Sequence, residues 1–294
     1  MKETSSFIME PKVDFCFKEL LRDPLVRQGF IAAVLEVPPE EIVRTELLPT
    51  YLWKKRKKEK QGILDVRVLI NGMDEMDVEI QVEAFREWPE RSVFYLGRMF
   101  TENLREGEDY GKLRKCIHVG ILDFILFPED KEYYSRFHIW EDRRRRKYTD
   151  KLEVHIIELP KLVRRNYPDS ELLNWARFLN GKGKEELQMI GKVNRYLGRA
   201  YEVLLEISGS ERKRLAYEAR KKATLDHNYL MRTNREEGYR EGHASGYQEG
   251  HTSGVTEGLA LAKNMLRLSS EGKSAQEIAK ELGVSPEEVR KIIE

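Results

Sequence analysis

Residues 63–82, which read ILDVRVLINGMDEMDVEIQV, carry the pattern that decides the fold. Two apolar, largely β-branched runs flank Asn71-Gly72, and this dipeptide is the strongest short-range signal for a β-hairpin. In the second run, Glu79 and Gln81 are two residues apart and therefore share one face of a strand. The stretch predicts two neighbouring antiparallel strands, residues 63–70 and 76–82.

The hairpin also predicts a pair of carboxylates. Asp65 interrupts the apolar residues of the first strand, and Asp65 and Glu79 are nearly symmetric about the turn, so we expect their side chains at the same level. Two carboxylates this close in a half-buried sheet repel each other, and a hard divalent cation such as Mg²⁺ relieves the repulsion. The spacing alone leaves a second interpretation open, in which both carboxylates only line a solvated face.

The flanking segments predict a mixed α/β sandwich. The run 116–126 is apolar except for His118 and Asp123, which is typical of a strand buried on both faces at the centre of a sheet. The periods of the other runs predict helices over 13–21, 25–35 and 90–106 and strands over 43–53, 133–140 and 152–159.

The amino-acid composition limits the functions that the chain can have. The chain has 294 residues, of which 40% are hydrophobic, enough for a substantial core, and its 52 basic and 51 acidic residues leave a net charge of only +1. A basic coat over the whole protein is therefore excluded, and a polyanion site requires local charge segregation. Residues 53–61 and 141–151 are basic and residues 72–87 are acidic, although any one such run is also typical of a solvated loop.

Other classes of protein find little support. Cys16 and Cys116 both lie in apolar runs, which favours buried thiols in a reducing compartment. We expect a cytoplasmic protein without a membrane span, because no secretory signal opens the chain and no apolar run reaches the ~18–20 residues that a span needs. No glycine loop of the phosphate-binding type is present, so no nucleotide cofactor is expected.

The second half predicts helices over 170–179, 185–206 and 211–232, followed by a glycine repeat. Glycine recurs every four residues from Gly238 to Gly258. Such glycines cost about 0.8–1 kcal/mol each in a helix relative to alanine. They also form a smooth stripe along which two helices can approach closely. The repeat therefore predicts either a helix for homo-oligomer formation or a flexible linker.

The last residues resemble a helix-turn-helix. Ser274 and Ser285 are each followed three residues later by glutamate, and this is the capping-box pattern at the start of two short helices. Gly283 stands between them, where the turn is expected. The second helix is not strongly basic, so a DNA-reading segment and a docking module for protein both remain open.

Several motifs together resemble the Rpn family of recombination-promoting nucleases, also described as transposases, within the PD-(D/E)XK nuclease superfamily. The resemblance covers roughly residues 9–179, and the glycine-repeat tail is similar to that family as well. The matching residues are Asp14 with Phe17-Lys18, Asp65, Glu79-x-Gln81, Arg91, Tyr95, Gly107-x-x-Tyr110, Glu158-Leu-Pro-Lys161 and Trp175.

The resemblance implies a restriction-endonuclease-like core in which Asp65 and Glu79 ligate Mg²⁺. Gln81 stands where the superfamily signature has lysine, and a neutral amide can position a water but cannot supply a cation. Asp14 is implied as a third catalytic carboxylate or a residue that orients the site. Lys18 is one turn away from Asp14, where it can pair with Asp14 or contact a DNA phosphate.

The resulting hypothesis is a Mg²⁺-dependent DNA endonuclease that promotes recombination. Its alternative is a catalytically inactive DNA-binding or assembly protein that acts through the C-terminal helices. The expected parts are a nuclease domain (1–180), a helical extension (181–235), the glycine repeat (236–259) and the helix-turn-helix-like segment (260–294). The basic run is expected to bind DNA through Lys54, Lys55, Arg56, Lys57 and Lys58.

Overall fold

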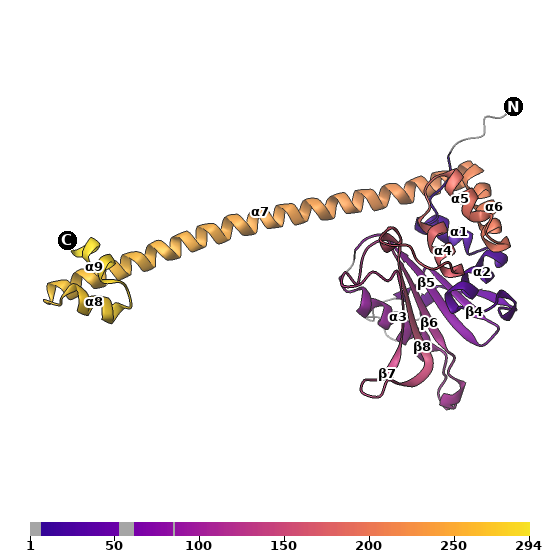
Figure 1. Cartoon of the computed structure of the whole chain (residues 1–294), viewed down its shortest axis with the longest axis horizontal. Coiled ribbons are helices and arrows are strands. Elements are labelled where there is room, and N and C mark those ends of the chain that lie inside the picture. The colour runs from indigo at the N-terminus through magenta and orange to yellow at the C-terminus, as the bar shows by residue number, and fades with distance from the viewer. Residues whose placement is uncertain (1–6, 53–61, 85) are drawn as a thin grey trace. The chain divides into compact units, whose positions relative to one another are not determined.

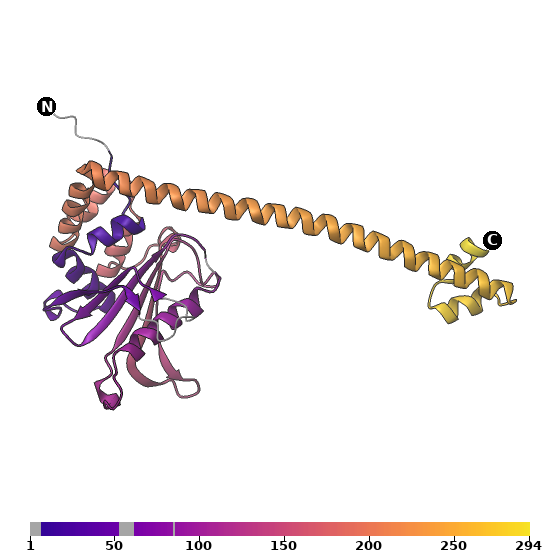
Figure 2. The same cartoon turned by 180° about the vertical axis from the view of Figure 1, so that it is seen from behind.

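The computed structural model describes residues 7–52, 62–84 and 86–294. The chain divides into two compact units, Met1–Leu225 and Asp226–Glu294. Figures 1 and 2 show the helices and strands from opposite sides. Each unit is described below by itself.

A mixed six-stranded sheet forms the centre of the first unit, in the order β1-β4-β5-β6-β8-β7. Strands β5, β6 and β8 are parallel to one another, whereas β1, β4 and β7 are antiparallel to the strands beside them. The strands are β1 (Thr45–Leu48), β4 (Val66–Ile70), β5 (Asp74–Gln81), β6 (Cys116–Leu122), β7 (Tyr134–Glu141) and β8 (Arg146–Glu158). Every residue of β6 is buried, which confirms the prediction of a central strand.

The predicted hairpin is present as β4 and β5. Asn71 and Gly72 both have positive φ, 52° and 75°, which is the backbone that the hairpin turn requires. Because side chains alternate along a strand, the residues of β4 and β5 divide between the two faces of the sheet. Val66, Val78 and the other apolar residues face the main core, whereas the charged residues face the opposite side.

Helices cover both faces of the sheet (Figure 1). Helix α3 (Trp88–Glu102) covers the face that carries the charged residues of β5, and its buried residues Trp88, Tyr95, Leu96 and Met99 recur at helical spacing. The other face packs against α1 (Asp14–Leu20), α2 (Pro24–Leu35), α4 (Glu171–Asn180), α5 (Lys184–Gly191) and α6 (Arg195–Gly209). Short 3₁₀ turns η1 (Pro39–Glu41), η2 (Tyr110–Lys112) and η3 (Leu159–Val163) join elements.

Three predicted elements are divided in the structure. The strand predicted over 43–53 becomes β1 and β2 (Tyr51–Leu52), and the strand over 63–70 becomes β3 (Gly62–Ile63) and β4. β2 and β3 pair as a separate ribbon, so Asp65 lies at a bend and not within a strand. The helix predicted over 185–206 is also two helices, because the Asn194 side chain accepts hydrogen bonds from Tyr196 N and Leu197 N and so begins α6.

The second unit is helical. Helix α7 (Glu211–Ser270) begins within the first unit, and its part from Asp226 onward belongs to the second unit and includes the whole glycine repeat. Helices α8 (Ala275–Leu282) and α9 (Pro286–Ile293) follow it. Both capping boxes, Ser274 with Glu277 and Ser285 with Glu288, are formed as predicted. A small core joins the end of α7 to α8 and α9 through Met265, Leu268, Ile278, Ala279 and Val289. In the part of the chain that the structure describes, none of the helices has the length and apolar character needed to cross a membrane.

Candidate active site

The β4–β5 register brings the two predicted carboxylates together. Val66 pairs with Val78, so Asp65, one residue earlier, lies at the level of Glu79. Asp65 Oδ2 accepts a hydrogen bond from Ile80 N at 3.2 Å, and this bond holds the bend at Asp65 against β5. A local bend thus places the Asp65 carboxylate beside β5 and within reach of α1, whereas Glu79 lies on the face that α3 covers.

Helix α1 adds a cation and a third carboxylate. Lys18 Nζ lies 2.9 Å from Asp65 Oδ1 and 2.6 Å from Asp14 Oδ1, so one ammonium joins two carboxylates. Burial raises the pKa of Asp65, although the Lys18 charge opposes this shift. Burial lowers the pKa of Lys18, but the two carboxylates outweigh it, and the net shift is upward. Lys18 therefore stays charged at this position.

Glu79 is the most unusual group of the site. Its side chain is 2% exposed, and neither carboxylate oxygen accepts a hydrogen bond from the residues that the structure describes. Arg91 forms an ion pair with this carboxylate, with Nη2 3.5 Å from Glu79 Oε1. Burial is the main reason that the pKa of Glu79 rises to about 7, with His118 and Arg91 opposing the rise. Glu79 is thus a buried carboxylate with unused acceptor capacity.

Gly120 on β6 explains how α3 approaches the site so closely. Gly120 pairs with Glu79 across the sheet, and a β-carbon at Gly120 would lie 2.8 Å from Trp88 Cζ2. Trp88 and Tyr95 in turn hold Arg91, whose guanidinium lies 5.6 and 5.3 Å from their ring centroids. Tyr95 therefore acts as scaffold, whereas Arg91 both packs on α3 and faces Glu79.

A buried histidine–aspartate pair lies beside Glu79 and was not predicted from the sequence. His118 Nδ1 lies 2.8 Å from Asp77 Oδ2, and both side chains are fully buried. Burial lowers the pKa of His118, but the Asp77 carboxylate outweighs it and the net shift is upward. The signal was the alternation of acids at Glu75, Asp77 and Glu79, which places all three on one face; nothing in the sequence pointed to His118 as their neighbour.

The remaining predicted residues lie in different surroundings. Gln81 ends β5 half-buried, and its backbone carbonyl accepts a hydrogen bond from Asp123 N at 2.9 Å. Asp123 in turn pairs with Lys12 at 2.7 Å, so a second cation borders this end of the sheet. Lys54, Lys55, Arg56, Lys57 and Lys58 lie outside the described residues, and their role in DNA binding stays a prediction.

The Glu158–Lys161 motif has a scaffolding geometry. Lys161 is fully buried, with Nζ 2.8 Å from Glu158 Oε2 and 2.9 Å from Asp130 Oδ1. Glu158 Oε1 also accepts a hydrogen bond from Leu126 N at 2.6 Å. These contacts tie the segment that follows β6 to the end of β8, as expected for a scaffold.

The donor set fits a hard cation. Within residues 7–52, 62–84 and 86–294, no three His, Cys, Asp or Glu side chains are spaced to hold a metal ion by themselves. Mg²⁺, however, is usually held by one or two carboxylates, with waters and substrate phosphate as the other ligands. Asp65 and Glu79 supply oxygen donors of this kind, and neither buried oxygen of Glu79 accepts a hydrogen bond from the described residues.

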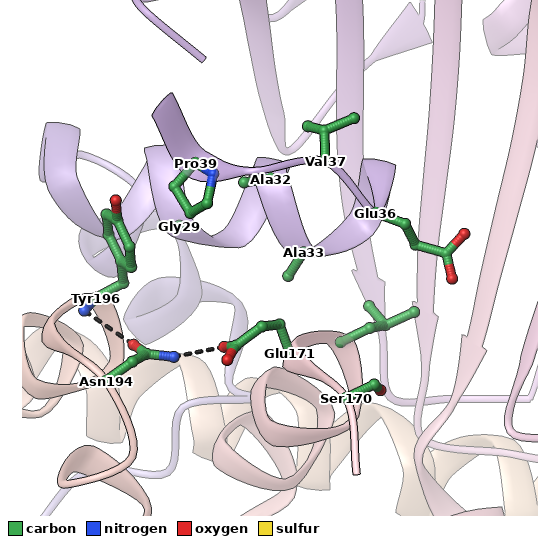
Figure 3. A pocket seen from close by; sticks show the side chains of 11 residues that line it. Gly29, Ala32, Ala33, Glu36, Val37, Pro39, Ser170, Glu171, Asn194 and Tyr196 are labelled. Atoms are coloured by element: carbon green, nitrogen blue, oxygen red, sulfur yellow. Dashed lines mark hydrogen bonds between the residues drawn. The ribbon is translucent and has the colours of Figure 1, made fainter. Parts of the chain in front are cut away.

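A pocket of about 390 Å³ lies on the helical side of the first unit (Figure 3) and shares no residue with the carboxylate site. Its wall on α2 consists of small residues, Gly29, Ala32 and Ala33. Asn194 Nδ2 donates a hydrogen bond to Glu171, so two of its polar side chains already satisfy each other. We assign no ligand to this pocket.

Comparison with known proteins gives one match. The sequence model of the family described as PD-(D/E)XK nuclease family transposase matches residues 11–234. This range includes α1, the whole sheet, α3 and the carboxylate site. No curated protein and no solved structure matches the chain.

Proposed function

Since the chain belongs to the PD-(D/E)XK nuclease family of transposases, we propose that it is a Mg²⁺-dependent DNA endonuclease that promotes recombination. Asp65 and Glu79 would hold the metal, and the reaction would be hydrolysis of a phosphodiester bond by water. The observation that carries this proposal is the buried Glu79 carboxylate, which has no hydrogen-bond donor among the described residues and lies level with Asp65.

The bound metal would lower the pKa of a coordinated water and stabilise negative charge on the phosphate. The chain's own groups have complementary tasks. Lys18, held by Asp14 and Asp65, can present its ammonium to a DNA phosphate and so supply the positive charge that the neutral Gln81 lacks. Gln81 can orient a water through its amide. Arg91 keeps a positive charge beside Glu79 and limits the cost of its burial.

Two further features belong to the proposal. The glycine repeat in α7 would join two copies of the chain, so that each copy contributes one site and both strands of a duplex can be cut. The two cysteines are buried and unpaired, in keeping with the reducing cytoplasm as the location.

The test is a plasmid-nicking assay on the full-length chain with Mg²⁺, with Mn²⁺ and with chelator. We expect metal-dependent nicking by the wild type and none by Asp65→Ala or Glu79→Ala. Glu106→Ala, which removes an exposed acid beyond α3, is the matched control and should cut at the wild-type rate.

Three outcomes are informative. Wild-type rates in either carboxylate variant would contradict the assignment of the site. Cleavage that persists in chelator would contradict the metal. A wild type that binds DNA and never cuts would instead support the alternative, an inactive DNA-binding or assembly protein that works through its C-terminal helices.

A further inference from the structure

The tip of the β7–β8 hairpin concentrates positive charge far from the carboxylates. Residues 143–146 are four consecutive arginines, followed by Lys147, and all five are exposed. Glu141 binds Arg144, through Nε at 3.1 Å and the backbone N at 2.7 Å. Of the carboxylates that the structure describes, none lies within ion-pair distance of the other three arginines, Arg143, Arg145 and Arg146.

The hairpin tip is locally unfavourable in two ways. Neighbouring guanidinium groups repel one another. Arg145 also has φ of 53°, a left-handed conformation that glycine and asparagine adopt more readily than arginine. A turn chosen for stability alone would place glycine there. Strained residues of this kind cluster at functional sites, where a segment meets a partner.

The hairpin has the form of an arm. Strand β8 begins at Arg146 but pairs with β6 only from Leu152, so its first residues pair with β7 alone. Irregular register on either side of Ile139 bends this two-stranded part, which extends beyond the sheet in Figure 1. Trp140 and Tyr148 on the arm are 45% and 84% exposed, so aromatic surface accompanies the charge.

We propose that this arm, residues 139–148, is a second DNA-binding element that grips the phosphate backbone irrespective of sequence. Guanidinium groups match phosphate oxygens in a bidentate geometry, and a two-stranded ribbon is narrow enough to enter the major groove. The inference rests on the proposed function, because DNA is the polyanion that the same unit would cut.

The tip of the arm lies far along the strands from the carboxylate site. Arg146 lies six residues before Leu152, which is level with Cys116 and Glu75, and Glu79 lies four residues further along β5. At about 3.3 Å per residue, these ten residues span at most about 33 Å, and the bend in the arm shortens that distance. Removing its charge should therefore weaken DNA binding and leave the carboxylate site intact.

The test compares triple variants of the full chain in metal-free buffer, where no DNA is cut. Arg143→Gln/Arg145→Gln/Arg146→Gln removes the three arginines without a partner. Arg164→Gln/Lys182→Gln/Lys192→Gln makes the same change in net charge at exposed positions elsewhere in the unit. Fluorescence anisotropy with a labelled duplex then gives affinity between about 50 and 200 mM salt.

We expect the arm variant to lose about tenfold or more in affinity and to lower the slope of log affinity against log salt by about 2–3. The control should change the slope by less than about one. Replacement of the same three arginines by lysine should retain most of the slope, because it keeps the charge, and this separates charge from misfolding.

Equal slopes in the arm and control variants would overturn the inference. The inference would also be overturned if the arm variant kept the DNA affinity of the wild type but lost binding to anionic lipid vesicles, which would identify a membrane as the partner. If the wild type cuts DNA but the arm variant keeps the wild-type salt slope, only the proposed role of the arm is overturned. If the wild type never cuts DNA but the arm variant lowers the salt slope, only the proposed nuclease function is overturned.

Discussion

At the scale of single residues, burial of the Glu79 carboxylate makes the stability of the fold depend on pH. The pKa of this carboxylate rises from 4.5 to about 7 because it is buried. The folded state therefore holds a proton that the unfolded state releases, and stability falls as the pH rises from about 4.5 to about 7. Metal binding needs the ionised form, so it should strengthen over the upper part of the same range.

This argument makes a prediction for Glu79→Gln. At pH 8 the variant should be more stable than the wild type, by about 3 kcal/mol at most, since one pKa unit corresponds to ~1.4 kcal/mol. The gain should shrink steadily as the pH falls toward 5. Urea unfolding of wild type, variant and the control Glu106→Gln at both pH values checks it. An equal gain at both values would show that Glu79 is not the titrating group.

Replacing Lys18 should change metal affinity and cleavage rate in opposite directions. The Lys18 ammonium lies 2.9 Å from Asp65 Oδ1, so it would compete with a metal held by that carboxylate. Lys18→Met should therefore tighten Mn²⁺ binding while cleavage slows, because the phosphate loses a cation. Calorimetric titration of Mn²⁺ and single-turnover cleavage measure the two effects. Weaker metal binding in the variant would mean that Lys18 supports the site in another way.

At the scale of elements, the close approach of α3 to β6 depends on one missing side chain. Gly120→Ala should destabilise the first unit by about 1–3 kcal/mol, because the new β-carbon would overlap the Trp88 ring. It should also disturb Arg91, which contacts the same ring. Thermal unfolding of the variant measures the loss.

Gly97→Ala is the matched control within α3. Nothing lies within 4 Å of a β-carbon built at Gly97, so alanine should raise helix stability by up to about 1 kcal/mol. If both substitutions had the same effect, the packing of Trp88 on Gly120 would not be what positions the helix.

At the scale of the whole molecule, the proposed association of two chains depends on the glycine repeat in α7. A β-carbon built on any of Gly238, Gly242, Gly246, Gly250, Gly254 or Gly258 meets nothing within 4 Å in the described chain, so the stripe is open. Its glycines lower helix propensity and leave no internal contact in return. Association along the stripe would supply the missing stabilisation.

Replacing Gly242, Gly246 and Gly250 by leucine should abolish self-association, because bulky side chains hold two backbones apart. The same three positions as alanine fit the single chain and favour the helix, but they add methyl groups at the contact, so weaker association should persist. Sedimentation of the three proteins checks this. A monomeric wild type would contradict the proposed oligomer.

Most of what could be predicted from the sequence depends on interactions between residues that are close in the chain. The level of Asp65 with Glu79 depends on a third loop residue, Met73, because Ile70 pairs with Asp74. The hairpin itself followed from the Asn71-Gly72 turn, which acts within a few residues of itself. The capping boxes at Ser274 and Ser285 were predictable for the same reason, since each involves residues three apart.

Tertiary packing decided the contacts between distant residues. Lys18 reaches Asp65 from another element, His118 meets Asp77 across 41 positions, and Arg91 faces Glu79 from a helix. Packing also divided the predicted strand at Asp65, because β2 and β3 pair with each other. The sequence by itself determined what neighbours in the chain can do; the unused acceptors of Glu79 and the charges around it arise only when the sheet and α3 exclude water from both sides.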